Sequence, residues 1–93
     1  MNAFLINELQ LFLKRPEMYI SKREREHVVA FIHGMEIGSQ CQFKLTERLS
    51  EWMESNHGIT NRALGWPYQI EVYAEKKSID WFDGFKEIVE ELL

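Results

Sequence analysis

The chain has 93 residues, of which 45% are hydrophobic and 28% are charged, and its formal net charge is −4. This length suits one domain, the composition excludes a disordered chain, and the lack of any run of about 18 apolar residues excludes a membrane span. The excess of acids argues against direct nucleic-acid binding, which needs basic side chains to neutralise phosphates.

The charge is distributed unevenly along the chain. Residues 1–46 carry six basic and five acidic side chains, whereas residues 47–93 carry five basic and ten acidic ones, a net charge of −5. An acidic half suits a basic protein partner, because complementary charge speeds encounter, although acids can also simply keep a small protein soluble. Cys41 is the only cysteine, which fits a reducing cytoplasm. The first residues lack the basic stretch of a signal peptide, so we expect a cytoplasmic protein.

The first expected helix covers residues 2–13, where apolar side chains recur at helical spacing. Asn2 is the expected cap, and Pro16 should end the helix near Lys14, since proline disfavours helical geometry in the residue before it. The following segment, residues 18–20, reads Met-Tyr-Ile and is too apolar for a solvated loop. We therefore expect at least two of its three side chains to lie in the core.

The longest expected helix covers residues 21–41. Ser21 and Glu24 have the spacing of a capping box, in which each side chain bonds to the backbone N–H of the other residue. Gly34 and Gly38 lie one turn apart within this helix. Because glycine lowers helix stability, we expect both to be positions of close packing.

A third helix is expected over residues 45–56, with Gly58 as a left-handed cap at its end. The segment 66–75 is ambiguous, because its apolar and polar residues alternate as in a strand. No second strand is visible for it to pair with, and Pro67 is favoured at the first position of a helix. A short helix is therefore the preferred interpretation, with a strand as the alternative.

The last expected helix follows Ser78, which we expect to cap it. Asp80 and Asp83 would lie in its first turn, where the helix dipole favours acids. Gly84 would allow a neighbouring element to approach closely, and Trp81, beside the apolar stripe, should be half exposed. Five helices around one core predict an all-α fold, a single compact bundle that forms one domain over the whole chain.

The histidines and the cysteine do not form a catalytic or metal-binding motif. His27 and His33 are six residues apart, so on a helix they face different directions, and no H-x-x-x-H or C-x-x-C spacing occurs. Glu87 and Glu91 could ligate a cation from one helix face, but such pairs usually form a solvated surface. We therefore expect no enzyme, no cofactor and no metal.

Five short segments form a pattern along almost the whole chain. They are Arg15-Pro16-Glu17-Met18-Tyr19, Phe31-Ile32-His33-Gly34, Phe43 to Trp52, Trp66-Pro67-Tyr68-Gln69-Ile70, and Phe82 to Leu92. The pattern resembles small helical bacterial immunity proteins that are found beside polymorphic or contact-dependent toxins. The first segment is also similar to the opening of the ATPase domain of type II topoisomerase B subunits. This chain lacks the asparagine-bearing helix and the glycine-rich boxes that such a domain needs.

The resemblance to immunity proteins implies a non-enzymatic inhibitor of a cognate toxin, often a nuclease, with an RNase favoured over a DNase. Nuclease active sites are basic clefts, and an acidic helix with aromatic anchors can occupy one. Charge and expected exposure select seven candidate toxin-binding residues: Glu51, Glu54, Asp80, Trp81, Asp83, Glu87 and Glu90. Glu51 and Glu54 are expected beside the acidic face of the last helix.

The expected partner is a basic toxin domain, bound in a heterodimer. The alternative is a small homo-oligomeric adaptor or regulator with no toxin, which would self-associate through exposed aromatic side chains.

Overall fold

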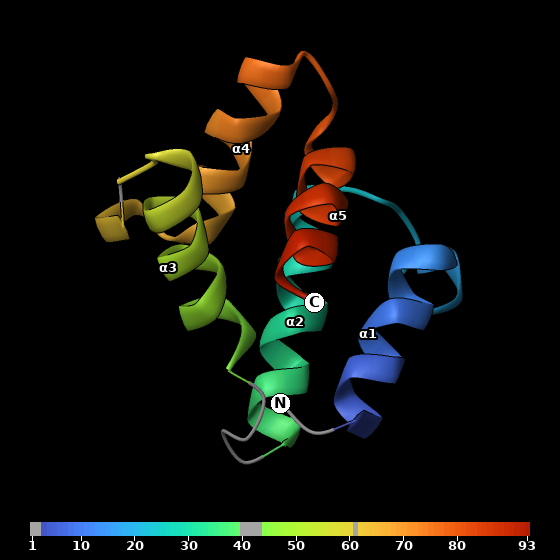
Figure 1. Ribbon diagram of the computed structural model, residues 1–93. Helices are drawn as coiled ribbons and strands as arrows, with labels where there is room; N and C mark the ends of the chain where they lie inside the picture. The colour runs from blue at the N-terminus through green and yellow to red at the C-terminus, as the bar shows by residue number, and fades with distance from the viewer. Residues whose placement is uncertain (1–2, 40–43, 61) are drawn as a thin grey trace. The chain divides into compact units, whose positions relative to one another are not determined.

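The structure is a computed structural model that describes residues 3–39, 44–60 and 62–93. Within these ranges every regular element is a helix and no strand occurs, which confirms the all-α class with its five α-helices (Figure 1). Residue contacts divide the chain into two units, Met1–Leu45 and Thr46–Leu93, which are described separately below. The single domain therefore stays a prediction. None of the helices in the described ranges is long and apolar enough to cross a membrane.

The first unit contains α1 (Ala3–Lys14), the short 3-10 helix η1 (Pro16–Met18) and α2 (Arg25–Gly38). α1 ends at Lys14, as predicted from Pro16, and its predicted cap Asn2 lies outside the described residues. The apolar face of α1 is buried, and its Phe12 stacks on Phe31 of α2 with ring centroids 4.3 Å apart. This ring pair joins the two helices.

The connection between α1 and α2 is more exposed than predicted. Met18 is 72% exposed, Tyr19 is 37% exposed and Ile20 is half buried, so the expectation that at least two of them lie in the core is wrong. The buried residue of this connection is Pro16. The N–H groups of Tyr19 and Ile20 both donate to the carbonyl oxygen of Pro16, so the chain turns tightly around the buried proline and the residues that follow it stay nearer the surface.

The capping box at the start of α2 is also wrong. The helix begins at Arg25, and Glu24 occupies the N-cap position without a side-chain capping bond. Ser21 lies three residues before that position, too far to reach the free N–H groups of the first turn. Its hydroxyl instead lies 3.2 Å from Nδ1 of His27. The predicted end of this helix at Cys41 falls outside the described residues, and α2 is described as far as Gly38.

The two glycines of α2 do not serve internal close packing. Among the described residues, no atom lies within 4 Å of the place where a Cβ would stand at Gly34 or Gly38. Both residues are exposed, so the prediction of close packing is wrong at both positions.

The second unit contains most of α3 (Leu45–His57), the 3-10 helix η2 (Arg62–Leu64), α4 (Trp66–Lys77) and α5 (Trp81–Leu92). Gly58, with φ of +66°, follows α3 in the left-handed conformation that was predicted. The segment 66–75 is helical, with Pro67 in the first turn, so the preferred interpretation is confirmed. Its buried residues Ile70, Tyr73 and Ala74 follow helical spacing, and this face outweighs the alternation in sequence.

α4 and α5 run side by side, joined by a short turn (Figure 1). A Cβ at Gly84 would stand 3.0 Å from Cβ of Ala74, so the predicted close approach at this glycine is confirmed. Ser78 does not cap α5. It ends α4 in a left-handed conformation with φ of +57°, and its N–H bonds back to Ala74 and Glu75. Asp80 is the N-cap of α5 instead.

Candidate protein-binding surface

α5 presents one strongly acidic side to solvent. Its opposite side buries Phe82, Phe85, Ile88 and Val89 at helical spacing, which fixes the direction of the polar residues between them. Five exposed acids lie on the solvent side, and we call four of them the acidic face: Asp80, Asp83, Glu87 and Glu90. The sequence therefore predicted correctly that these four side chains share an exposed surface.

Two acids of this face also hold the fold. The carboxylate of Asp80 accepts the backbone N–H of Asp83 at 2.8 Å and caps the helix. Oε1 of Glu87 accepts the hydroxyl of Tyr73 on α4 at 2.8 Å. Among the described residues, Glu90 has only a long contact of 4.0 Å with Lys86, which is worth little at an exposed site. Asp83 and Glu90 are thus the acids best placed to bond to a partner.

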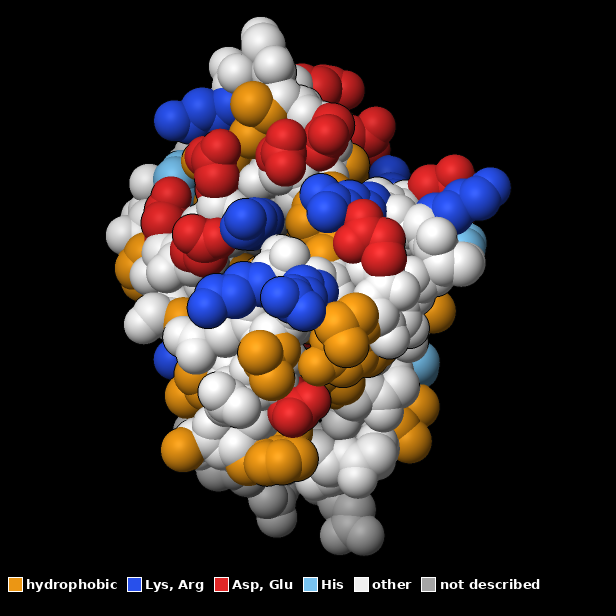
Figure 2. Space-filling view, turned by 90° about the vertical axis from the view of Figure 1, so that its right-hand side faces the viewer, with side chains coloured by type: hydrophobic (Ala, Val, Ile, Leu, Met, Phe, Trp, Pro, Cys, Tyr) orange, Lys and Arg blue, Asp and Glu red, His pale blue; other side chains and the backbone are white. Residues whose placement is uncertain are grey.

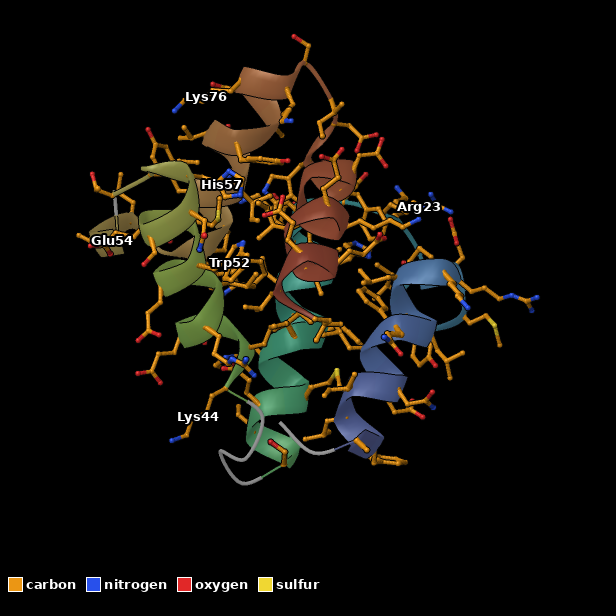
Figure 3. The ribbon with its side chains drawn as sticks, viewed as in Figure 1. Arg23, Lys44, Trp52, Glu54, His57 and Lys76 are labelled. Atoms are coloured by element: carbon orange, nitrogen blue, oxygen red, sulfur yellow. The ribbon has the colours of Figure 1, made fainter. Side chains whose placement is uncertain are left out.

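Glu91, at the edge of the acidic face, connects α5 to α3. Its Oε1 accepts Nε1–H of Trp52 at 3.0 Å and lies 2.9 Å from Nε2 of His57. In Figure 3, Trp52 and His57 lie on the side of α3 that faces α5. Burial raises the pKa of Glu91, but the hydrogen bonds from Trp52 and His57 outweigh burial and hold it below its ordinary 4.5. This carboxylate therefore stays charged and holds the two helices together.

Tyr73 joins the same junction from α4. Burial, followed by its bond to Glu87 and the nearby charge of Glu91, raises the pKa of its hydroxyl to about 12. Its ring packs edge-on against His57, with centroids 5.0 Å apart, and Nζ of Lys77 lies 5.8 Å from the ring centroid.

Sequence reasoning missed this junction of Trp52, His57, Tyr73 and Glu91. A signal was present, because buried Trp and Tyr usually need a partner for their N–H or O–H group. Nothing in the linear order, however, pairs residue 52 with residue 91.

Trp81 is half buried, as predicted. Its ring stacks on Phe85 with centroids 5.6 Å apart and an interplanar angle of 7°, and it also contacts Trp66. Its Nε1–H donates to the carbonyl of Pro67 at 3.0 Å. One ring face and the N–H group are thus used within the second unit, and only the remaining surface could anchor a partner.

Glu51 and Glu54 are both exposed on α3, and Glu54 is not directed toward the acidic face. Glu54 points away from α5, whereas Trp52 and His57 on the same helix point toward it (Figure 3). Glu51 borders a hollow of about 400 Å³ that is also lined by Gly65 and Trp66. The expectation that Glu54 lies beside the acidic face of α5 is therefore wrong, whereas the place of Glu51 beside that face stays a prediction.

Within residues 3–39, 44–60 and 62–93, no group of three or more His, Cys, Asp or Glu side chains is placed to bind a metal ion. Glu87 and Glu91, considered in the sequence as a cation-binding pair, each accept hydrogen bonds from neighbouring helices. Cys41 lies outside the described residues.

Comparison of the chain with family models, with curated proteins and with solved structures gives no match. Its function is therefore inferred from the geometry of its surfaces and from the pattern of its sequence.

Proposed function

We propose that this chain is an immunity-type protein that binds a basic bacterial toxin domain and neutralises it, with the acidic face of α5 as the contact surface. The toxin class that we favour is a nuclease, an RNase before a DNase, in keeping with the sequence pattern. One observation carries the proposal: Asp83 and Glu90 project from a helix whose opposite side is buried, and neither bonds to α3 or α4 in the described residues.

A charged face on a rigid helix suits this role for two reasons. The net charge of −5 over residues 47–93 attracts a basic surface from a distance and raises the association rate. The packing of α5 against α4 at Gly84 keeps the carboxylates in place before the partner arrives, which reduces the entropy lost on binding.

The test uses a double charge reversal, Asp83→Lys with Glu90→Lys, against the product of the toxin-like reading frame beside the gene. These two positions leave the Asp80 cap and the Tyr73–Glu87 bond intact. We expect the association rate to fall by about tenfold or more at low salt, and the rate to lose much of its salt dependence. Protection of cells from the toxin should fall in parallel.

The matched control is Glu47→Lys with Glu75→Lys. Both pairs of substitutions change the net charge by the same amount. Each pair also combines an acid from the first turn of a helix with one from a last turn, so the effects of the helix dipole on stability are similar. The control should lose less of the association rate than the test pair, because its two charges lie on other helices than the acidic face, and its dissociation rate should stay close to that of the wild type. Equal losses in the two double variants would show that net charge alone acts, and unchanged binding in both would reject the acidic face.

A second candidate function is the homo-oligomeric adaptor without a toxin. The observation in its favour is that large apolar side chains, including Phe4 and Ile37, are strongly exposed in the first unit. A light-scattering mass of the isolated chain separates the two functions. A stable oligomer, together with no binding to the neighbouring gene product, would favour the adaptor.

A further inference from the structure

The first unit has an apolar groove of about 480 Å³ between α1 and α2. Its walls come from Phe4, Leu5 and Glu8 of α1, from Tyr19, and from Phe31 and Met35 of α2. Figure 2 views the chain from the side of α1 and shows hydrophobic side chains gathered there around an acidic one. Phe4, at the edge of the groove, is 69% exposed. The volume lies in the range of about 300–1,000 Å³ that is typical of binding pockets.

A buried aromatic ring holds the aromatic wall of this groove in place. Phe12 is fully buried and stacks on Phe31. Tyr19 lies against both rings, with centroids 5.8 Å from Phe12 and 5.4 Å from Phe31. A wall whose rings are already packed loses little side-chain entropy when a ligand arrives. Tyr19, which was predicted to lie in the core and is partly exposed, thus forms part of a preformed surface.

Glu8 determines the charge that the groove accepts. Its side chain is half buried, and it makes no ion pair or side-chain hydrogen bond within the described part of the chain. Aromatic rings next to a carboxylate attract a cation twice, through the ring faces and through the ion pair. A Lys or Arg with an apolar stem satisfies both contacts and covers apolar surface as well.

We propose that this groove binds an amphipathic helix of a partner protein, with apolar side chains between α1 and α2 and one Lys or Arg against Glu8. A helix satisfies its own backbone hydrogen bonds, and the described residues offer no strand edge that could pair with an extended peptide. Gly38 lines the groove and Gly34 lies one turn before it on α2. A Cβ at either position would meet no atom of the described residues within 4 Å, so a partner backbone can approach closely. This inference does not depend on the toxin proposal.

The probe is a displayed library of amphipathic helical peptides of about 14 residues, roughly four turns, with one face randomised. It is selected on the full chain and counter-selected on a triple variant, Glu8→Lys with Gly34→Leu and Gly38→Leu. We expect the enriched peptides to carry apolar residues flanking a Lys or Arg. Amide chemical shifts of the chain should change along α1 and α2 when such a peptide is added.

The effect of each substitution on the binding of one enriched peptide is then measured. Glu8→Lys should weaken its binding by about tenfold, whereas Glu26→Lys, a charge reversal elsewhere on the same unit, should leave binding unchanged. The double variant Gly34→Leu with Gly38→Leu should also weaken binding about tenfold. That variant should unfold at a higher urea concentration than the wild type, because leucine favours a helix and its Cβ would meet no atom of the described residues within 4 Å. Loss of binding in it is therefore not loss of fold.

Three results would overturn the proposal. The selection could yield no peptide that prefers the wild type over the triple variant. The enriched peptides could lack a basic residue, or bind equally well after Glu8→Lys. The isolated chain could form a dimer that the glycine-to-leucine pair dissociates, which would assign the groove to a second copy of the chain.

Discussion

Replacing Glu91 by Ala should destabilise the second unit, although this residue lies on an outer helix face near the end of the chain. Its Oε1 accepts Nε1–H of Trp52 and contacts Nε2 of His57, at 3.0 and 2.9 Å. A hydrogen bond to a charged group contributes about 1.5–3 kcal/mol. The side chain is 39% exposed, so solvent screening limits the ion pair with His57 to about 1 kcal/mol or less. We expect the free energy of unfolding to fall by about 2 kcal/mol.

The effect of Glu91 should depend on pH in a defined direction. Its folded pKa is held below 4.5 by the bonds from Trp52 and His57, against the opposing effect of burial. A carboxyl whose folded pKa is depressed binds fewer protons in the folded state. Its contribution is therefore fully present above its ordinary pKa of 4.5 and is lost as the pH falls through the folded value.

Urea unfolding, followed by tryptophan fluorescence and circular dichroism, measures both effects at about pH 7 and about pH 3. The difference between wild type and Glu91→Ala should be large at neutral pH and smaller in acid. Glu90→Ala is the matched control, since its only ion pair in the described chain is the 4.0 Å contact with Lys86. It should change stability by a few tenths of a kcal/mol. Equal stability of Glu91→Ala and wild type at neutral pH, or a difference independent of pH, would refute the role given to this carboxylate.

Two further predictions concern the same unit. Asp80→Ala removes the cap of α5 and should lower the free energy of unfolding by about 1 kcal/mol. Ser78→Gly should raise it, because glycine adopts the left-handed conformation of residue 78 without strain. Urea unfolding in which Asp80→Ala is more stable than Ser78→Gly would contradict the assignment of the cap. Because burial and the bond to Glu87 raise the pKa of Tyr73 from 10.0 to about 12, its protonated form stabilises the fold below pH 10.0, and this stability is lost as the pH rises toward 12. Tyr73→Phe should remove a phenolate absorbance step near pH 12. Loss of a step near the ordinary value of 10.0 instead would show that the hydroxyl is not bonded.

Helices were predictable where one local rule dominated. Pro16 ended α1 at the expected place, and Pro67 identified α4 against an alternating pattern that favoured a strand. Proline acts through its own ring and its missing N–H, so its effect is local and can be read from sequence.

Caps and glycines were less predictable, because several residues can satisfy the same rule. Ser21 and Ser78 both have the chemistry of an N-cap, yet the positions were taken by Glu24 and Asp80. Gly84 packs closely against Ala74, whereas Gly34 faces open space. Glycine in a helix predicts a close approach only when a second element is present, and that element is set by tertiary structure.

The acidic surface shows why charge counted along a sequence overstates the charge available to a partner. Long-range attraction depends on every carboxylate, including those bonded within the unit, because a hydrogen bond to Tyr73 or Trp52 leaves the negative charge in place. Short-range bonds to a partner need carboxylate oxygens with no competing donor, which restricts them chiefly to Asp83 and Glu90. Salt dependence of the association rate should therefore report the whole acidic half, while the dissociation rate should respond mainly to these two residues. A charge reversal that changed only dissociation would thus identify a direct contact, and one that changed only association would identify a residue of the surrounding field.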